Sequence, residues 1–136
     1  MLRIVAAPNA MKGSLSASAA AASIARGVEE AFKFFNLKAG RSLKFQVIQK
    51  PVADGGDNTV DVIADKFYET PVCGPLFEST INAKWGSYGK TAIIEMAKAS
   101  GIALVKPSQL DPFKATTYGT GQLISKAIDA GFKNIL

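Results

Sequence analysis

Apolar and polar positions in the first third of the chain predict a strand followed by a helix. Residues 2–7 form a short apolar run that Pro8 and Asn9 close, as expected for a buried strand and a loop. From Ser16 onward apolar side chains recur with a period of about 3.6 residues, which predicts a helix that Ser14 or Ser16 caps. The apolar face of this helix contains Ile24, Val28, Ala31, Phe32 and Phe35.

A second strand and helix are predicted next. Apolar and polar residues alternate over residues 43–48 before Pro51, which indicates a strand. A helix with Val60, Ile63, Ala64 and Phe67 on one face is expected after it. Strand, helix, strand, helix is typical of a parallel, right-handed βαβ sheet. The opposite helical face would carry acidic residues four apart, as either a solvated face or a site for an ion or basic partner: Asp57, Asp61, Asp65 and Glu69.

The pattern changes after residue 70, where residues 70–75 resemble a boundary. A strand over 79–85, a turn at Gly86 to Gly89 and a β-rich run over 91–95 are expected there. One helical turn over 96–100 with Gly101 as its cap and a last helix from near Thr120 to Gly131 follow. Residues 134–136 begin what reads as a further strand, so the chain looks cut. The fold class is therefore α/β.

Composition narrows the possible chemistry. The 136 residues are 48% apolar and contain no His, which excludes Ser-His-Asp and Cys-His nucleophile systems and any imidazole base. The single Cys73 is expected to be an idle thiol, because it has no partner for an intrachain disulfide. No apolar run approaches the roughly 20 residues of a membrane span, and the start carries no signal pattern. These features predict a cytoplasmic protein.

The net charge of +5 raises the question of nucleic acid. The basic residues are scattered, and the one basic stretch lacks clustered arginines, so a solvated basic face is the favoured interpretation. A nucleic-acid-binding domain is the weaker alternative, and it predicts salt-dependent binding to random DNA. The stretch contains Lys33, Lys38, Arg41, Lys44 and Lys50.

Three predicted strand-to-helix junctions contain residues suited to anions: residues 9–16, 53–59 and 116–122. Helix starts offer unpaired amides, and glycine lets the backbone approach a phosphate closely. No Walker A sequence is present, and Gly119 and Gly121 lack the third glycine of a dinucleotide fingerprint. Each junction alone also reads as an ordinary capping loop, whereas three together favour phosphate chemistry.

Three side chains have two interpretations each. Asp54 could hold magnesium or accept a hydroxyl proton, or it is a plain helix cap. Lys12 could neutralise charge on a transferred phosphoryl group, or it is a surface lysine. Glu95 lies within an apolar run and must be paired, exposed on an edge, or functional.

Five segments in order resemble the N-terminal motifs of bacterial type I glycerate kinases. The segments are APNAMKGSLSA (7–17), KPVADGGDNTVD (50–61), CGPL (73–76), KTAIIEMAKASGIALV (90–105) and TTYGTGQLISKAIDAG (116–131). The resemblance implies ATP-dependent phosphorylation of glycerate with magnesium, mostly at the 2-hydroxyl to give 2-phosphoglycerate. It also implies a flavodoxin-like domain with a second α/β domain inserted in it. Residues 1–72 would then belong to the first domain, and residues 73–136 would begin the insertion.

The resemblance covers only the N-terminal part of such a kinase. Family members continue into a glycine-rich GGSATND-type segment and a second group of site residues, so this chain alone is expected to be inactive. The alternative is a non-catalytic truncated or split-gene product that acts only with a C-terminal complementing chain or self-associates. Exposed apolar surface and unpaired strand edges would favour such association.

The resemblance and the junctions together assign candidate site residues. Lys12 and Asp54 are the expected catalytic residues. Two junctions depart from the family pattern. The family usually reads APDS in the first, where this chain has Asn9 and Ala10 in place of the Asp and the Ser. In the second, the usual ADGGEGT reads ADGGDNT here. The expected substrate- and phosphate-binding residues are Asn9, Ser14, Gly55, Gly56, Glu95, Thr116, Thr117, Gly119, Thr120 and Gly121.

Overall fold

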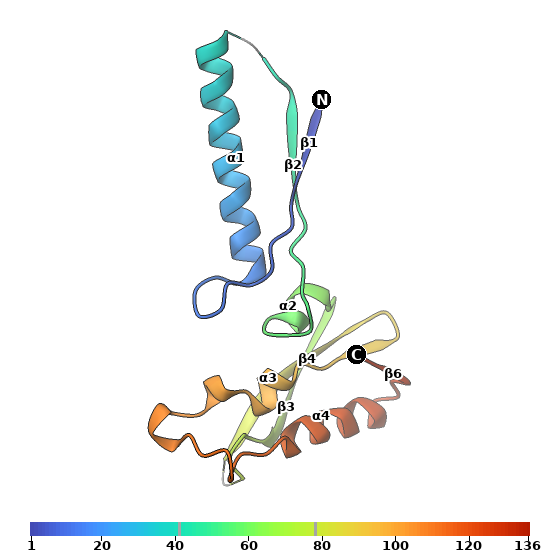
Figure 1. The fold of residues 1–136 in the computed structure, drawn as a ribbon. Coiled ribbons are helices and arrows are strands. Elements are labelled where there is room, and N and C mark those ends of the chain that lie inside the picture. The colour runs from blue at the N-terminus through green and yellow to red at the C-terminus, as the bar shows by residue number, and fades with distance from the viewer. Residues whose placement is uncertain (41, 78) are drawn as a thin grey trace. The chain divides into compact units, whose positions relative to one another are not determined.

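The computed structural model describes residues 1–40, 42–77 and 79–136 (Figure 1). These residues fold as two compact units, Met1–Asp54 (unit 1) and Gly55–Leu136 (unit 2). Both units combine helices with strands, which confirms the α/β class. The two units are defined by packing within this chain. They do not test the expected domain boundary at residues 72/73, which stays a prediction.

Unit 1 is a βαβ arrangement. Strand β1 (Leu2–Ala6) lies parallel to β2 (Phe45–Gln49), and helix α1 (Ala17–Ala39) connects them. The hydroxyl of Ser16 accepts the N–H of Ala19 at 3.2 Å and caps the helix start, as the sequence predicts. The helix ends at Gly40 in the left-handed conformation (φ 56°), which glycine adopts without steric cost.

Alanines are the most deeply buried residues of α1. Its buried residues are Ala17, Ala20, Ala21 and Ala25, all in the first half of the helix. In the second half Phe32 stacks on Phe45 of β2 with ring centroids 4.5 Å apart. Leu37 is 82% exposed, so the apolar face of α1 is only partly covered within unit 1.

Unit 2 contains a four-stranded mixed sheet in the order β3-β4-β5-β6. The first two pairings are antiparallel and β5 pairs with β6 in parallel, which confirms a strand at Asn134. The strands are β3 (Lys66–Cys73), β4 (Thr80–Tyr88), β5 (Thr91–Ile93) and β6 (Asn134–Ile135). The helices are α2 (Thr59–Ile63), α3 (Met96–Ser100) and α4 (Tyr118–Asp129), with 3-10 turns at Ile102–Leu104 and Pro107–Gln109.

The core of unit 2 lies between this sheet and helices α3 and α4. Trp85 and Leu123 are its largest members, and Val72 and four alanines complete the buried cluster. The Trp85 indole N–H donates to the hydroxyl of Thr70 at 3.0 Å, so its one polar atom is satisfied. Tyr68 stacks on the same indole with ring centroids 4.4 Å apart.

The second predicted helix is wrong beyond Ile63. Helix α2 ends there, and residues 66–73 form β3, which includes Phe67 and Glu69. Eight residues of β3 pair with β4, and this long ladder outweighs the local helical period. The predicted turn from Gly86 to Gly89 starts too early: the chain turns at Gly89, whose φ is 57°, but Gly86 lies inside β4, where a side chain would come 2.8 Å from the carbonyl oxygen of Lys66. None of the described helices is long and apolar enough to cross a membrane.

Candidate functional site

Two of the predicted junctions leave the same edge of the sheet in unit 1. Because β1 and β2 are parallel, their carboxyl ends meet at one edge. The pairing continues past both strands: the N–H of Lys50 donates to Ala6 O at 2.8 Å, and that of Val52 donates to Pro8 O at 3.1 Å. The loops that begin at residues 7 and 50 are therefore held side by side.

The first of these loops is a tight turn. The amide oxygen of Asn9 accepts the N–H of Ala10 at 2.7 Å, and Met11 O accepts the N–H groups of Ser14 and Leu15. Gly13 has a φ of 72°, which lets the chain reverse there. This turn leaves the side chains of Lys12 and Ser14 exposed to solvent.

The second loop ends unit 1 with Asp54, which is exposed. The edge thus carries a cation from one loop and a carboxylate from the other, beside the polar side chains of Asn9 and Ser14. A lysine ammonium can bind an anion and a carboxylate can accept a proton, so these residue types suit the expected chemistry.

In unit 2 the glycine-rich segment 55–58 turns sharply into α2. Gly55 has a φ of 93° and Asn58 a φ of 72°, so two residues of the segment are left-handed. The hydroxyl of Thr59 donates to Gly56 O at 2.7 Å, and its N–H donates to the same oxygen at 3.3 Å. The buried Thr59 therefore fixes the end of the turn.

Glu95 is buried and paired rather than exposed on an edge. It is 3% exposed, and its two carboxylate oxygens accept the N–H groups of Asn58 at 3.1 Å and Val60 at 3.2 Å. The ammonium of Lys98 lies 3.8 Å from one of these oxygens. A carboxylate at a helix start is stabilised by the unpaired amides and the helix dipole.

The expected acidic helix face does not form, because Glu69 lies on β3. Asp61 instead forms ion pairs with Lys84 and with Lys98, the latter at 3.2 Å. Partial burial acts to raise the pKa of Asp61, but hydrogen bonds and charge from the two lysines outweigh it and lower that pKa below its ordinary value of 3.8. Within the described ranges no three metal-ligating side chains gather.

One glycine of the third junction, residues 116–122, is needed for packing. Gly119 is buried at the start of α4, and a side chain there would collide with the carbonyl oxygen of Cys73 on β3. Gln122 accepts the N–H of Cys73 at 2.7 Å, and the hydroxyls of Thr120 and Ser100 share a hydrogen bond of 2.8 Å. Gly121, in contrast, faces open space. Thr116 accepts the N–H of Tyr118 at 3.1 Å, and Thr117 is exposed.

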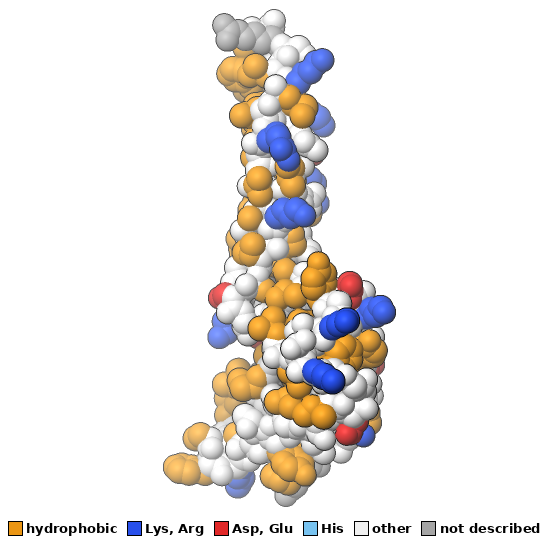
Figure 2. All heavy atoms as spheres, turned by 90° about the vertical axis from the view of Figure 1, so that its right-hand side faces the viewer, with side chains coloured by type: hydrophobic (Ala, Val, Ile, Leu, Met, Phe, Trp, Pro, Cys, Tyr) orange, Lys and Arg blue, Asp and Glu red, His pale blue; other side chains and the backbone are white. Residues whose placement is uncertain are grey.

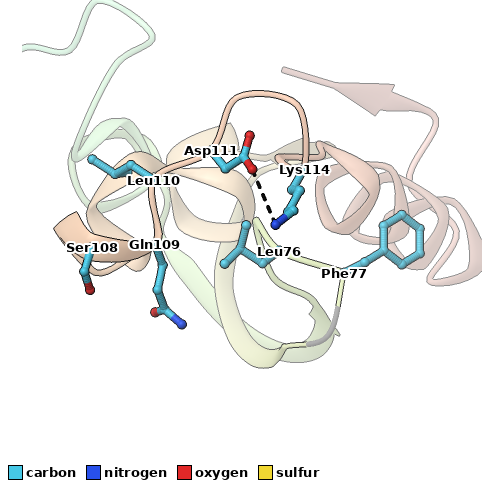
Figure 3. Close-up of a pocket in the computed structure, with 7 residues that line it drawn as sticks. All are labelled: Leu76, Phe77, Ser108, Gln109, Leu110, Asp111 and Lys114. Carbon is cyan, nitrogen blue, oxygen red and sulfur yellow. Dashed lines mark ion pairs between the residues drawn. The ribbon is translucent and has the colours of Figure 1, made fainter.

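A hollow in unit 2 lies apart from the predicted site residues (Figure 3). Its volume is about 620 Å³, and Lys114 pairs with Asp111 at 3.5 Å within its wall. Leu76, Phe77 and Leu110 supply apolar lining. The hydropathy pattern does not indicate this hollow, because its lining residues come from loops and one 3-10 turn, which carry no periodic signal.

The basic residues of unit 1 are spread over its surface. Lys33, Lys38, Lys44 and Lys50 are exposed, and Arg41 lies outside the described residues. On the face shown in Figure 2, lysine and arginine side chains are interspersed with exposed hydrophobic ones. This surface favours the interpretation of a solvated basic face.

Comparison with known proteins identifies the family. The profile of the glycerate kinase family matches residues 4–136. The chain belongs to the glycerate kinase family. It is 43% identical to the glycerate 2-kinase of Escherichia coli K12 and 39% identical to the glycerate kinase of Bacillus subtilis 168, in each case over 99% of this chain. A crystal structure of a candidate glycerate kinase 2 from Salmonella typhimurium LT2 matches with a TM-score of 0.70 and 37% identity, covering 99% of this chain and 35% of that one.

This glycerate kinase family chain spans 34% of the length of the curated relatives it matches. Asn9, Lys12, Ser14 and Asp54 lie in the two loops that leave one sheet edge of unit 1. The candidates in unit 2 lie at the start of α2, before α3 and at the start of α4. The role of each candidate in binding or catalysis stays a prediction.

Proposed function

We propose that this chain is the N-terminal portion of a kinase that phosphorylates glycerate with ATP, at the 2-hydroxyl, giving 2-phosphoglycerate. The observation that carries the proposal is the shared edge of unit 1, where the pairing of Val52 with Pro8 holds the loops of Lys12 and Asp54 side by side. Membership of the glycerate kinase family supports the choice of substrate.

The transfer can be written with the residues of this edge. The substrate hydroxyl oxygen attacks the γ-phosphorus of ATP, its proton passes to the carboxylate of Asp54, and the bond to the departing ADP oxygen breaks. Lys12 stabilises the charge that the transferred group and its leaving oxygen carry. The reaction then depends on positioning and charge neutralisation, and it needs no covalent intermediate.

The remaining candidates other than Glu95 are proposed to bind substrate or phosphate within their own units. Asn9 and Ser14 offer an amide and a hydroxyl beside Lys12 in unit 1. In unit 2 the glycine-rich segment that contains Gly55 and Gly56 is proposed to bind an anion, and so is the start of α4, where Thr117 is exposed. The α4 candidates are Thr116, Thr117, Gly119, Thr120 and Gly121.

Magnesium fits this proposal as a companion of the nucleotide. The described residues form no three-residue metal cluster. Mg²⁺ in kinase sites is commonly held by one or two carboxylates together with substrate phosphates and waters. The exposed carboxylate of Asp54 suits that pattern, as the alternative to its role as proton acceptor. When bound, the ion would neutralise phosphate charge.

We further propose that residues 1–136 alone do not catalyse the reaction, because the matched relatives are about three times longer. The alternative is a non-catalytic product that works only with a complementing chain. Exposed Val5 and Leu37 in unit 1 favour association with further polypeptide. ATP as substrate supports a cytoplasmic location.

The first experiment is the intact mass of the native protein from its source cells. A mass well above 14.3 kDa supports the kinase reading, and an assay of ATP-dependent glycerate phosphorylation on that protein follows. A mass of 14.3 kDa favours the complementing-chain alternative, which size-exclusion chromatography of the isolated chain then tests.

Variants of the native protein test the assigned roles. Lys12→Met and Asp54→Asn should each lower kcat by about 100-fold or more, the usual loss when a charge-stabilising group or a general base is removed. Lys33→Met and Asp129→Asn are matched controls, because both residues are exposed helix positions. Unchanged kcat in the first pair, or no phosphorylation of glycerate by the native protein, would contradict the proposal.

A further inference from the structure

Glu95 connects two segments that are far apart in sequence. It precedes α3, and its carboxylate reaches the start of α2, where it accepts the N–H groups of Asn58 and Val60. The side chain is nearly fully buried. A buried carboxylate is costly unless hydrogen bonds satisfy it, so these two amides are its principal partners.

The segment that Glu95 holds has an uncommon backbone conformation. Asn58 is the one positive-φ residue other than glycine among the described residues, and Gly55 is left-handed as well. An L-residue enters that region at a cost, which surrounding contacts must offset. Thr59 contributes by donating to Gly56 O, and Glu95 contributes by accepting the N–H of Asn58.

A chain of charges keeps the carboxylate of Glu95 in place. Lys98 lies 3.8 Å from Glu95 and 3.2 Å from Asp61 of α2, which also pairs with Lys84 of β4. The start of α2 and the residue before α3 are thus linked twice, by amide hydrogen bonds and through Lys98. The orientation of segment 55–58 therefore depends on α3 as well as on its own sequence.

We infer that Glu95 is a positioning residue for the glycine-rich segment 55–58, and that it does not itself contact substrate. The inference rests on the proposed function, in which this segment binds substrate or phosphate. Since Glu95 uses the amides of Asn58 and Val60, the part of the segment that faces an anion lies before Asn58.

The test is Glu95→Gln in the native protein. Glutamine keeps the size of the side chain but presents an NH2 group to one of the two N–H donors, so one hydrogen bond is lost. Hydrogen exchange of residues 55–60 should accelerate about tenfold. The KM for ATP or for glycerate should rise by about tenfold, with a smaller change in kcat, because the segment binds substrate without reacting.

Thr70→Val is the matched control. It removes the hydrogen-bond acceptor of Trp85 in the same unit but leaves segment 55–58 untouched. It should lower global stability without changing exchange at residues 55–60 or KM. If Glu95 only stabilised unit 2, Glu95→Gln would, like this control, leave KM unchanged.

Two outcomes would overturn the inference: unchanged exchange at residues 55–60 in Glu95→Gln, or accelerated exchange with unchanged KM for both substrates. Failure of the proposed function is recognised separately, from the wild-type protein. If wild-type native protein does not phosphorylate glycerate, the proposed function fails and the positioning role fails with it, before any variant is compared.

Discussion

Unit 1 and unit 2 bury different kinds of side chain. In unit 1 the buried hydrophobic residues are all alanines, Ala6 of β1 and four from α1, among the residues described. In unit 2 they include Trp85, Leu123, Ile93 and Val72. Hydrophobic stabilisation scales with buried apolar area, and an alanine contributes one methyl group.

The difference in buried side chains means that unit 1 can adopt its fold and still be less stable than unit 2. The helix cap, the parallel pairing and the aligned loops of unit 1 are all in place. Its larger apolar side chains, such as Phe34 and Leu37, nevertheless remain more than half exposed. We therefore expect most of the unfolding free energy of the isolated chain to come from unit 2.

Leu123→Ala should have the largest effect on stability. Leu123 is fully buried in the cluster that contains Trp85, so truncation should lower the unfolding free energy by about 2–5 kcal/mol. Urea unfolding followed by the fluorescence of Trp85, the single tryptophan, measures it. Leu37→Ala in unit 1 is the control, and hydrogen exchange of residues 17–39, which reports unit 1, should show a cost below about 0.5 kcal/mol. Equal costs would break the comparison of the two units.

Gly119→Ala should destabilise unit 2 by about 1–3 kcal/mol, because the added methyl group collides with Cys73 O. Gly121→Ala has open space within α4 and should raise stability by up to about 1 kcal/mol. The same urea titration compares the two. If both variants are equally tolerated, packing does not explain Gly119.

Ser16→Ala should weaken unit 1 by about 1 kcal/mol through loss of the cap on α1. Hydrogen exchange of residues 17–25 reports this effect, since the fluorescence of Trp85 reports unit 2. Ser18→Ala is the matched control at an exposed position inside the helix, and it should leave exchange unchanged or slow it slightly. Equal acceleration by both variants would contradict the capping role.

Asp61→Asn should have the smallest effect, about 0.5–1 kcal/mol at pH 7, because its ion pairs are partly exposed and screened by solvent. Since folding lowers the pKa of Asp61, its contribution is fully present above 3.8 and disappears as pH falls through the lowered folded value. Wild type and variant should therefore converge in acid-unfolding titrations. A difference that persists at pH 2 would contradict the ion-pair explanation.

Local sequence predicts unit 1 better than unit 2. Strand β1, helix α1 with its Ser16 cap, and β2 follow the expected pattern within two residues at each described strand end. Residues 66–73 were missed, because Val60, Ile63, Ala64 and Phe67 fit a helical period although the segment pairs with β4. Local periodicity does not report which distant segment becomes a partner.

The same limit applies to the candidate site. The positions of Lys12 and Asp54 at one edge follow from two parallel strands, which the sequence signals. The partners of Glu95 do not, because Asn58 and Val60 lie 37 and 35 residues away along the chain. Gly119 likewise reads as an anion-binding glycine until the carbonyl of Cys73 is seen beside it.

The two parallel pairings have a consequence for how the chain is made. Leu2 pairs with Phe45 and Thr91 pairs with Asn134, so each pairing joins residues 43 positions apart. At a synthesis rate of about 5–20 residues per second, β1 waits roughly 2–9 s for its partner on the ribosome. Leu2, Ile4 and Val5 are unpaired during that interval. Nascent chains are therefore most open to chaperone capture, or to pairing with a neighbouring nascent copy, before β2 has left the exit tunnel.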